Sequence, residues 1–232
     1  MAKAIALVVG AGPGLGSALA RRFAKAGMTV AVARRNADTL QDLAKEIGGR
    51  AYACDVADAA SVAALFEAVE RDLGAPNLVA FNAGAYMRGG ILEIAPEDFE
   101  RCWRIGCMGG FLVGQAAARR MVPAGQGTIL FTGATAALRG SAGFANLAVP
   151  KFGLRALAQS MARELGPKGV HVAHVIIDGQ IAGERPGYRP EERGQDAVLS
   201  PDAIAEAYLQ VHQQPRSAWT QELDLRPYVE KF

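Results

Sequence analysis

The segment VVGAGPGLGSALARRF, residues 8–23, places three glycines in a spacing suited to binding phosphate groups. Gly10, Gly14 and Gly16 follow a short apolar run and precede a helical pattern. Glycines at such a turn let the backbone approach a pyrophosphate, and the helix N-terminus supplies amide donors and the positive end of a dipole. The spacing therefore predicts a dinucleotide site with contacts from Gly10, Gly14, Leu15 and Gly16.

Two arginines, Arg34 and Arg35, follow the second apolar run. An NAD site has an acidic residue at this point, which binds the 2′-hydroxyl of the ribose. Guanidinium groups suit a 2′-phosphate instead, so the pair favours NADP(H) as the cofactor. The alternative is that both arginines are solvated at the start of a helix.

Short apolar runs alternate with helical patterns along the whole chain, which indicates βαβ units and a parallel sheet covered on both faces. We expect strands at residues 4–9, 29–33, 52–54, 78–81, 128–132 and 170–177. We expect helices at residues 15–26, 36–48, 96–121 and 151–165, and also after the capping residues Asp58 and Ser200. This pattern predicts a doubly wound α/β fold in one domain, residues 1–232.

The charge and cysteine content of the chain indicate which kinds of binding partner and cellular location to expect. The 232 residues carry 25 basic and 23 acidic side chains without a run of one sign, which argues against nucleic acid or an anionic membrane and favours a small-molecule substrate. The three cysteines form no metal-binding spacing, and their odd number argues against a disulfide framework. We therefore expect no metal and a cytoplasmic protein, and we interpret the apolar start as a buried strand rather than a signal peptide.

Further motifs follow the glycine turn in order: Asp55–Val56, Asn82–Ala83–Gly84 and Lys151. With them, the chain resembles the short-chain dehydrogenase/reductase family over its whole length. The resemblance implies a Rossmann-type sheet of seven strands in the order 3-2-1-4-5-6-7. It also implies that Asp55 and Val56 border the adenine, that residues 82–84 line the cofactor, and that Lys151 reaches the nicotinamide ribose.

The family's proton-transfer residues are replaced in this chain. The family uses a Ser, a Tyr and a Lys, assisted by an Asn. In the register set by Lys151, Leu147 stands for the tyrosine, Ala134 for the serine and Gly106 for the asparagine. None of the three replacements has a side chain that transfers a proton, so the sequence predicts an apolar catalytic wall.

Three other residues are candidates for the missing acid: Tyr86 after the Asn82 turn, Tyr188, and Asp178 if burial keeps its carboxyl protonated. Each has a plainer interpretation. Tyr86 could cap the wall of the cleft, Tyr188 could be loop surface, and Asp178 could hydrogen-bond its own turn. Tyr188 lies in a segment, residues 178–199, that we expect to be a substrate loop, because ligands bind at the carboxyl ends of parallel strands.

Two functions fit this pattern. The first is an NADP(H)-dependent oxidoreductase acting on a small, partly nonpolar substrate such as a conjugated C=C, iminium or carbonyl compound. The second is a non-catalytic NADP(H)-binding sensor or regulatory subunit. Glycines at 109 and 110 and the apolar helix at 152–165, together with the resemblance, imply a homodimer or homotetramer.

Overall fold

A computed structural model of the protein describes residues 4–183 and 196–230, and its centre is one parallel sheet in the order β3-β2-β1-β4-β5-β6-β7. The strands are β1 (Ile5–Val9), β2 (Thr29–Arg34), β3 (Arg50–Ala53), β4 (Leu78–Phe81), β5 (Gly127–Thr132), β6 (Val170–Ile177) and β7 (Glu222–Leu225). The helices are α1 (Leu15–Lys25), α2 (Gln41–Glu46), α3 (Ala59–Asp72), α4 (Pro96–Trp103), α5 (Gly109–Ala124), α6 (Ala145–Leu165) and α7 (Pro201–His212). The predicted fold class and strand order are therefore confirmed.

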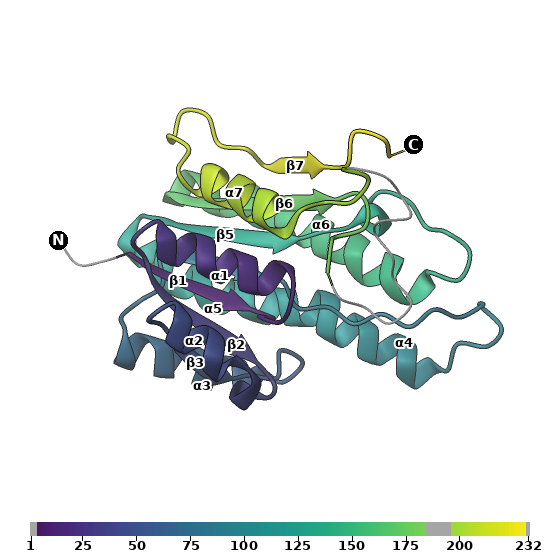
Figure 1. The fold of residues 1–232 in the computed structure, drawn as a ribbon, viewed down its shortest axis with the longest axis horizontal. Coiled ribbons are helices and arrows are strands. Elements are labelled where there is room, and N and C mark those ends of the chain that lie inside the picture. Colours follow the sequence, from purple (N-terminus) through teal and green to yellow (C-terminus); the bar gives the residue numbers. More distant parts are fainter. Residues whose placement is uncertain (1–3, 184–195, 231–232) are drawn as a thin grey trace.

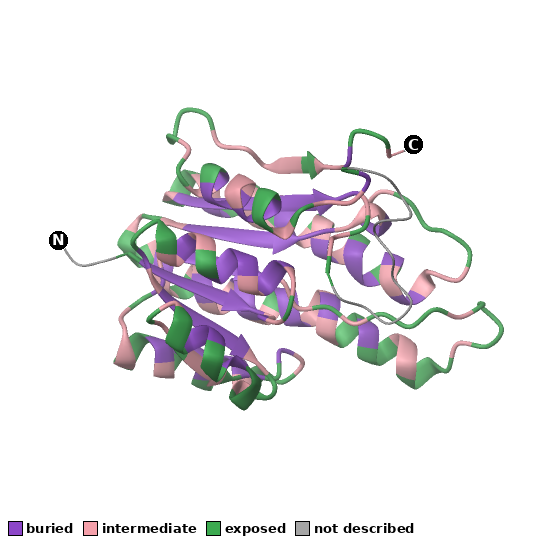
Figure 2. Ribbon diagram, viewed as in Figure 1, coloured by how far each residue is buried: buried purple, intermediate pink, exposed green. Residues whose placement is uncertain are grey.

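Helices cover both faces of the sheet (Figure 1). One core cluster joins the sheet to α1, α2 and α7, and a second joins it to α3, α5 and α6. All residues of β1, β4 and β6 are buried, and the central strands form the interior (Figure 2). Continuous apolar runs such as IALVV suit such strands because neither face of the sheet meets water.

The long helical stretch expected at residues 96–121 is present without a break, and it contains a π-helical segment. α4 ends at Trp103, a π-helical segment covers Arg104–Met108, and α5 continues to Ala124. The two glycines at the start of α5 pack within the chain: a Cβ on Gly109 would meet Val56, and one on Gly110 would meet Leu154. Their role in close packing is therefore internal to this chain.

α6 begins at Ala145, six residues before the expected start at Lys151. Proline lacks an N–H and destabilises helix interiors, yet Pro150 lies within α6. It is buried there and packs on Gly106, where an added Cβ would lie 3.0 Å from the Pro150 Cβ.

Other boundaries also differ. The helix expected at 36–48 divides into a 3₁₀ turn, Ala37–Leu40, and α2, although Asn36 caps the turn as expected by accepting from the Asp38 N–H. The sequence offered no residues for the seventh strand, which lies at Glu222–Leu225 and pairs with β6. Within the described residues, no helix is both long enough and apolar enough to cross a membrane.

Candidate active site

The glycine turn after β1 is tightly fitted to the turn after β4. Gly10 has φ +88°, and a Cβ on it would lie 2.6 Å from Ala83 Cα and nearer still to Ala83 N. Asn82 Nδ2 donates a hydrogen bond to the Gly10 carbonyl (3.1 Å), and the Asn82 N–H donates to Val9 O (2.8 Å). Only glycine fits at position 10, because the backbone of residues 82–83 occupies the place of a side chain.

The N-terminus of α1 meets this turn at close range. Gly14 has φ +89°, and a Cβ on Gly16 would lie 2.8 Å from Ala11 Cα. Together with Leu15 they line a hollow of about 240 Å³, which residues 181–183 close from the other side. The backbone amides of a helix start at such a hollow can bind a pyrophosphate.

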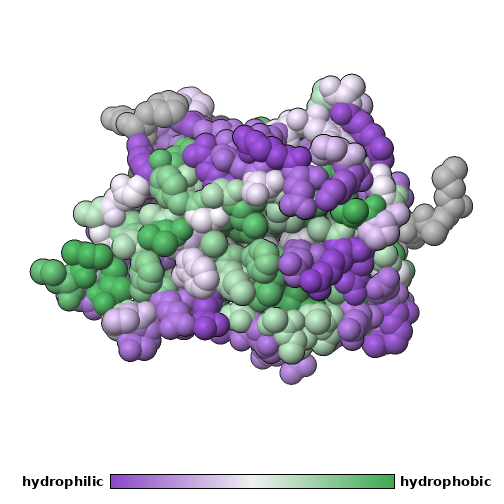
Figure 3. All heavy atoms as spheres, turned by 180° about the vertical axis from the view of Figure 1, so that it is seen from behind, coloured by the Kyte–Doolittle hydropathy of each residue, from purple (hydrophilic) through white to green (hydrophobic). Residues whose placement is uncertain are grey.

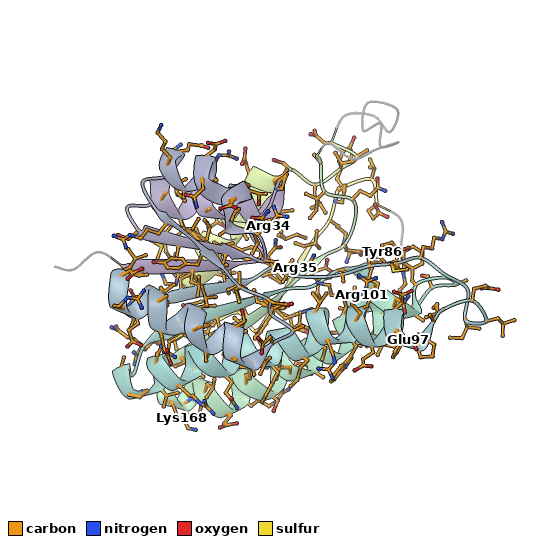
Figure 4. The ribbon with its side chains drawn as sticks, turned by 90° about the horizontal axis from the view of Figure 1, so that it is seen from below. Arg34, Arg35, Tyr86, Glu97, Arg101 and Lys168 are labelled. Carbon is orange, nitrogen blue, oxygen red and sulfur yellow. The ribbon has the colours of Figure 1, made fainter. Side chains whose placement is uncertain are left out.

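A larger cavity of about 690 Å³ adjoins this hollow, and the two share Gly10, Gly12 and Asn82. Arg34 and Arg35 line the cavity at the end of β2, and Arg34 Nη1 lies 3.8 Å from where a Gly12 Cβ would be. In Figure 4, Arg34 and Arg35 lie near the middle of the view, and Arg101 and Tyr86 lie close to each other beyond them. The arginine pair therefore lies in the same cavity as the glycine turn.

The turn after β3 forms another part of the cavity, with Asp55 and the buried Val56. The Asp55 N–H donates to Ser61 Oγ (2.9 Å), and Asp55 Oδ1 accepts from the Ala57 N–H (3.0 Å). These bonds fix the turn. The structure thus brings residues 82–84, Asp55, Val56 and the arginines at the end of β2 to one cavity.

Lys151 is buried and reaches the carboxyl end of β5, so it is no solvated helix lysine. Its Nζ donates to Thr132 O (2.6 Å), while Thr132 Oγ1 and Tyr208 Oη share a hydrogen bond of 2.8 Å. Burial lowers the pKa of Lys151 to about 8, since a desolvated ammonium loses its hydration. At neutral pH the ammonium is still mostly charged and has further N–H donors for a ligand.

The three residues predicted to form the apolar wall come from different elements. Leu147 lies one turn earlier in α6, Ala134 follows β5, and Gly106 lies under Pro150. Asn146, next to Leu147, is buried and donates from Nδ2 to Met87 O (3.2 Å). This bond ties the start of α6 to the loop that carries Tyr86.

The candidate acids Tyr86 and Asp178 have different surroundings in the structure. Tyr86 lines the large cavity, and its ring stacks on Phe144 with centroids 5.3 Å apart and planes at 13°. Asp178 is buried, but its Oδ2 lies 3.4 Å from Arg226 Nη2. Asp178 therefore lies beside a cation. Tyr188 lies outside the described residues.

Some residues near the site escaped the sequence analysis. Arg101 and Ile105 line the large cavity, and their i, i+4 spacing on a helix just after the Asn82 turn was the available signal. His174 is buried with its Nε2 2.6 Å from where a Gly133 Cβ would be. Burial and the Lys151 charge lower the His174 pKa to about 4, and neither ring nitrogen has a hydrogen-bond partner among the described residues.

Comparison with known proteins gives one family. Residues 4–182 match the family model of the short chain dehydrogenases. The D-threitol dehydrogenase of Mycolicibacterium smegmatis is 35% identical over 173 residues, covering 72% of this chain and 66% of that protein.

Solved structures agree with this match. A short-chain dehydrogenase from Rhodopseudomonas palustris is 43% identical with a TM-score of 0.84, covering 97% of this chain and 99% of its own. A metagenomic short-chain oxidoreductase in complex with NADP is 27% identical, also with a TM-score of 0.84, covering 99% of each chain. The sheet order, the glycine turn and these matches together show that the chain belongs to the short-chain dehydrogenase family.

Proposed function

We propose that the protein is an NADP(H)-dependent oxidoreductase. The observation that carries this proposal is the shared cavity of the glycine turn and of Arg34 and Arg35. Paired guanidinium groups favour a 2′-phosphate because they offer fixed, always charged donors. The NADP in the complex of the 27% identical oxidoreductase supports the same choice.

The cavity fits a dinucleotide, because the glycine turn leaves space for phosphates beside the α1 N-terminus. In our proposal the amides near Gly14 and Gly16 bind the pyrophosphate, and the adenine lies beside Asp55 and Val56. Lys151 donates to the hydroxyls of the nicotinamide ribose. When bound, the nicotinamide supplies or accepts the hydride.

The proposed substrate follows from the wall around Lys151. The side chains of Leu147 and Ala134 are partly buried and carry no proton that they could transfer. We therefore propose a small, partly nonpolar substrate that needs no phenol at this position: a conjugated C=C bond, an iminium, or a carbonyl protonated from elsewhere. Tyr86 is the candidate acid that lines the cavity, and its ring also supplies an apolar surface there.

We also propose that residues 178–199 form a substrate loop, of which residues 184–195 lie outside the described residues. What supports this is the start of the segment, since residues 181–183 line the hollow beside the glycine turn, next to the carboxyl ends of the strands. The two ends of the segment are joined, with the Ala182 N–H donating to Leu199 O and the Leu199 N–H donating to Gln180 O, both at 2.8 Å.

Assembly into a homodimer or homotetramer is proposed as well. Trp103, Phe111 and Phe152 are exposed on α4, α5 and α6, which pack on one another within the chain. The face behind the sheet in Figure 1 shows apolar patches among charged side chains (Figure 3). Light scattering should give twice or four times the chain mass, and a monomer at micromolar concentration would contradict the proposal.

Fluorescence titration with NADPH and NADH tests the cofactor first, with NADPH expected to bind more tightly. A panel of enones, imines and ketones then tests turnover through NADPH oxidation. Oxidation by a panel member with little activity on simple ketones is expected. Binding of NADPH without oxidation by any member would contradict the enzyme proposal and favour a sensor or regulatory subunit.

A further inference from the structure

One wall of the large cavity comes from α4 and the π-helical segment after it, which no family motif covers. Arg101 and Ile105 are four residues apart, so they lie on the same side of this helical stretch, and both line the cavity. Val56, from the turn after β3, lines it too and packs against Gly109, one turn beyond Ile105. This part of the cavity is a slot with apolar side chains and one guanidinium.

Arg101 is only loosely held. Its Nη2 donates to Asp98 Oδ1 (3.1 Å) in an ion pair whose arginine side chain is 51% exposed, and it also contacts Met87 Sδ. An exposed ion pair contributes little to stability, because water and salt screen it. The guanidinium can therefore turn toward a ligand at small cost.

Arg101 comes from another element than the arginines at the end of β2, and it shares a neighbouring hollow of about 270 Å³ with Arg35. Arg34 lies beside Gly12, at the phosphate end of the cavity, whereas Arg101 shares its helix face with Ile105 (Figure 4). The proposed NADP(H) site, on which this inference rests, puts the adenine at Asp55 and Val56. Arg101 is then close to the ring, and Arg34 and Arg35 are close to the 2′-phosphate.

We propose that Arg101 is a third arginine of the coenzyme site and that its planar guanidinium stacks on the adenine from the α4 side. A guanidinium stacks on aromatic faces through its flat, weakly hydrated surface, and a lysine ammonium does so less well. The two sets of cations then have different roles. Arg101 recognises any adenine nucleotide, and the β2 arginines recognise the extra phosphate.

Two ligands separate these roles: adenosine 2′,5′-bisphosphate and 5′-AMP, each titrated calorimetrically into the full-length protein. Arg101→Ala should weaken both ligands by a similar factor, about two- to fivefold. Arg101→Lys keeps the charge and should also weaken both. Arg35→Ala should weaken the bisphosphate far more than 5′-AMP. Thermal denaturation checks that each variant is folded.

Arg21→Ala is the matched control. The Arg21 side chain is 51% exposed, as that of Arg101 is, and it pairs with Glu46 (Nε to Oε1, 2.7 Å), but it lines neither cavity of the proposed coenzyme site. Its affinities should equal those of the unaltered protein. Unchanged affinities in Arg101→Ala would overturn the inference, and so would a loss confined to the bisphosphate. If the unaltered protein binds neither ligand, the proposed coenzyme site itself is wrong.

Discussion

The proposed coenzyme cavity and the proposed substrate wall near Lys151 are built from different kinds of group. The cavity depends on backbone geometry and fixed charge: Gly10 at φ +88°, the start of α1, and arginines at the end of β2. The proposed wall consists of Leu147, Ala134 and Gly106, whose side chains carry no polar atom. In our proposal, binding a dinucleotide and moving a proton are separate demands on the same sheet edge, and this wall supplies no group for the second.

Of the variants proposed here, the one that introduces a tyrosine at Leu147 and a serine at Ala134 should change enzyme activity most. The double variant Leu147→Tyr, Ala134→Ser places a phenol one turn before Lys151 and a hydroxyl after β5. Lys151 can keep its bond to Thr132 O and still donate to the phenol, because an ammonium has three N–H donors. We expect kcat/KM for simple ketones with NADPH to rise by about 10²–10⁴-fold, the usual contribution of general acid catalysis.

The control for this gain is Leu147→Phe with Ala134→Ser, which fills the same space without the phenol hydroxyl. It should leave ketone turnover at the level of the unaltered protein. Equal rates in the two double variants, with NADPH binding intact, would show that the missing phenol does not limit the reaction.

Two variants in the glycine turn, Gly14→Ala and Gly10→Ala, separate backbone strain from steric collision by their effects on stability. Gly14→Ala meets no atom within 4 Å, so it should cost only its backbone strain at φ +89°, about 1–3 kcal/mol of unfolding free energy. Gly10→Ala adds a collision with the backbone of Asn82 and Ala83 and should cost about 1–3 kcal/mol more. Urea denaturation measures both. Equal losses would mean that the close approach of the two turns is not what requires Gly10.

Lys151 is the residue that the two regions share, and its burial should be visible in the pH dependence of stability. Burial lowers the folded-state pKa to about 8, whereas the unfolded chain binds this proton up to about 10.5. Between these values the unfolded state holds more protons, so the free energy of unfolding rises with pH. Below about pH 8 the cost of burying the charge is fully present.

Relative to Lys151→Met, the unaltered protein should therefore gain roughly 2 kcal/mol between pH 7 and pH 10. Lys168→Met is the control, because Lys168 is exposed and pairs with Glu164 (3.3 Å). Its curve should run parallel to that of the unaltered protein. A parallel curve for Lys151→Met would contradict the burial of the ammonium.

Much of the coenzyme side could be predicted because its signals are local. The apolar run of β1 and the glycines after it belong to one short segment, and Asn36 and Asp58 cap the elements that follow them, as their residue types suggest. The substrate side depends on contacts between distant segments. The start of α6 before Pro150 requires Gly106, and the pairing of Asp178 requires Arg226. No single window of sequence contains both partners of these contacts.

Replacing Tyr86 should change the kinetics least of these variants. The replacement tests whether Tyr86, on the cavity side, is the proton donor for the reaction near Lys151. The ring is held by stacking on Phe144, so Tyr86→Phe keeps the stacked pair and loses only the hydroxyl. If the ring serves as an apolar surface, kcat and KM for an active member of the substrate panel should change less than twofold. Tyr86→Ala removes the stacking, a contribution of about 0.5–1.5 kcal/mol, and should raise KM about two- to tenfold. A fall in kcat of a hundredfold or more in Tyr86→Phe alone would instead make Tyr86 the proton donor, and the two regions would then be joined through this residue.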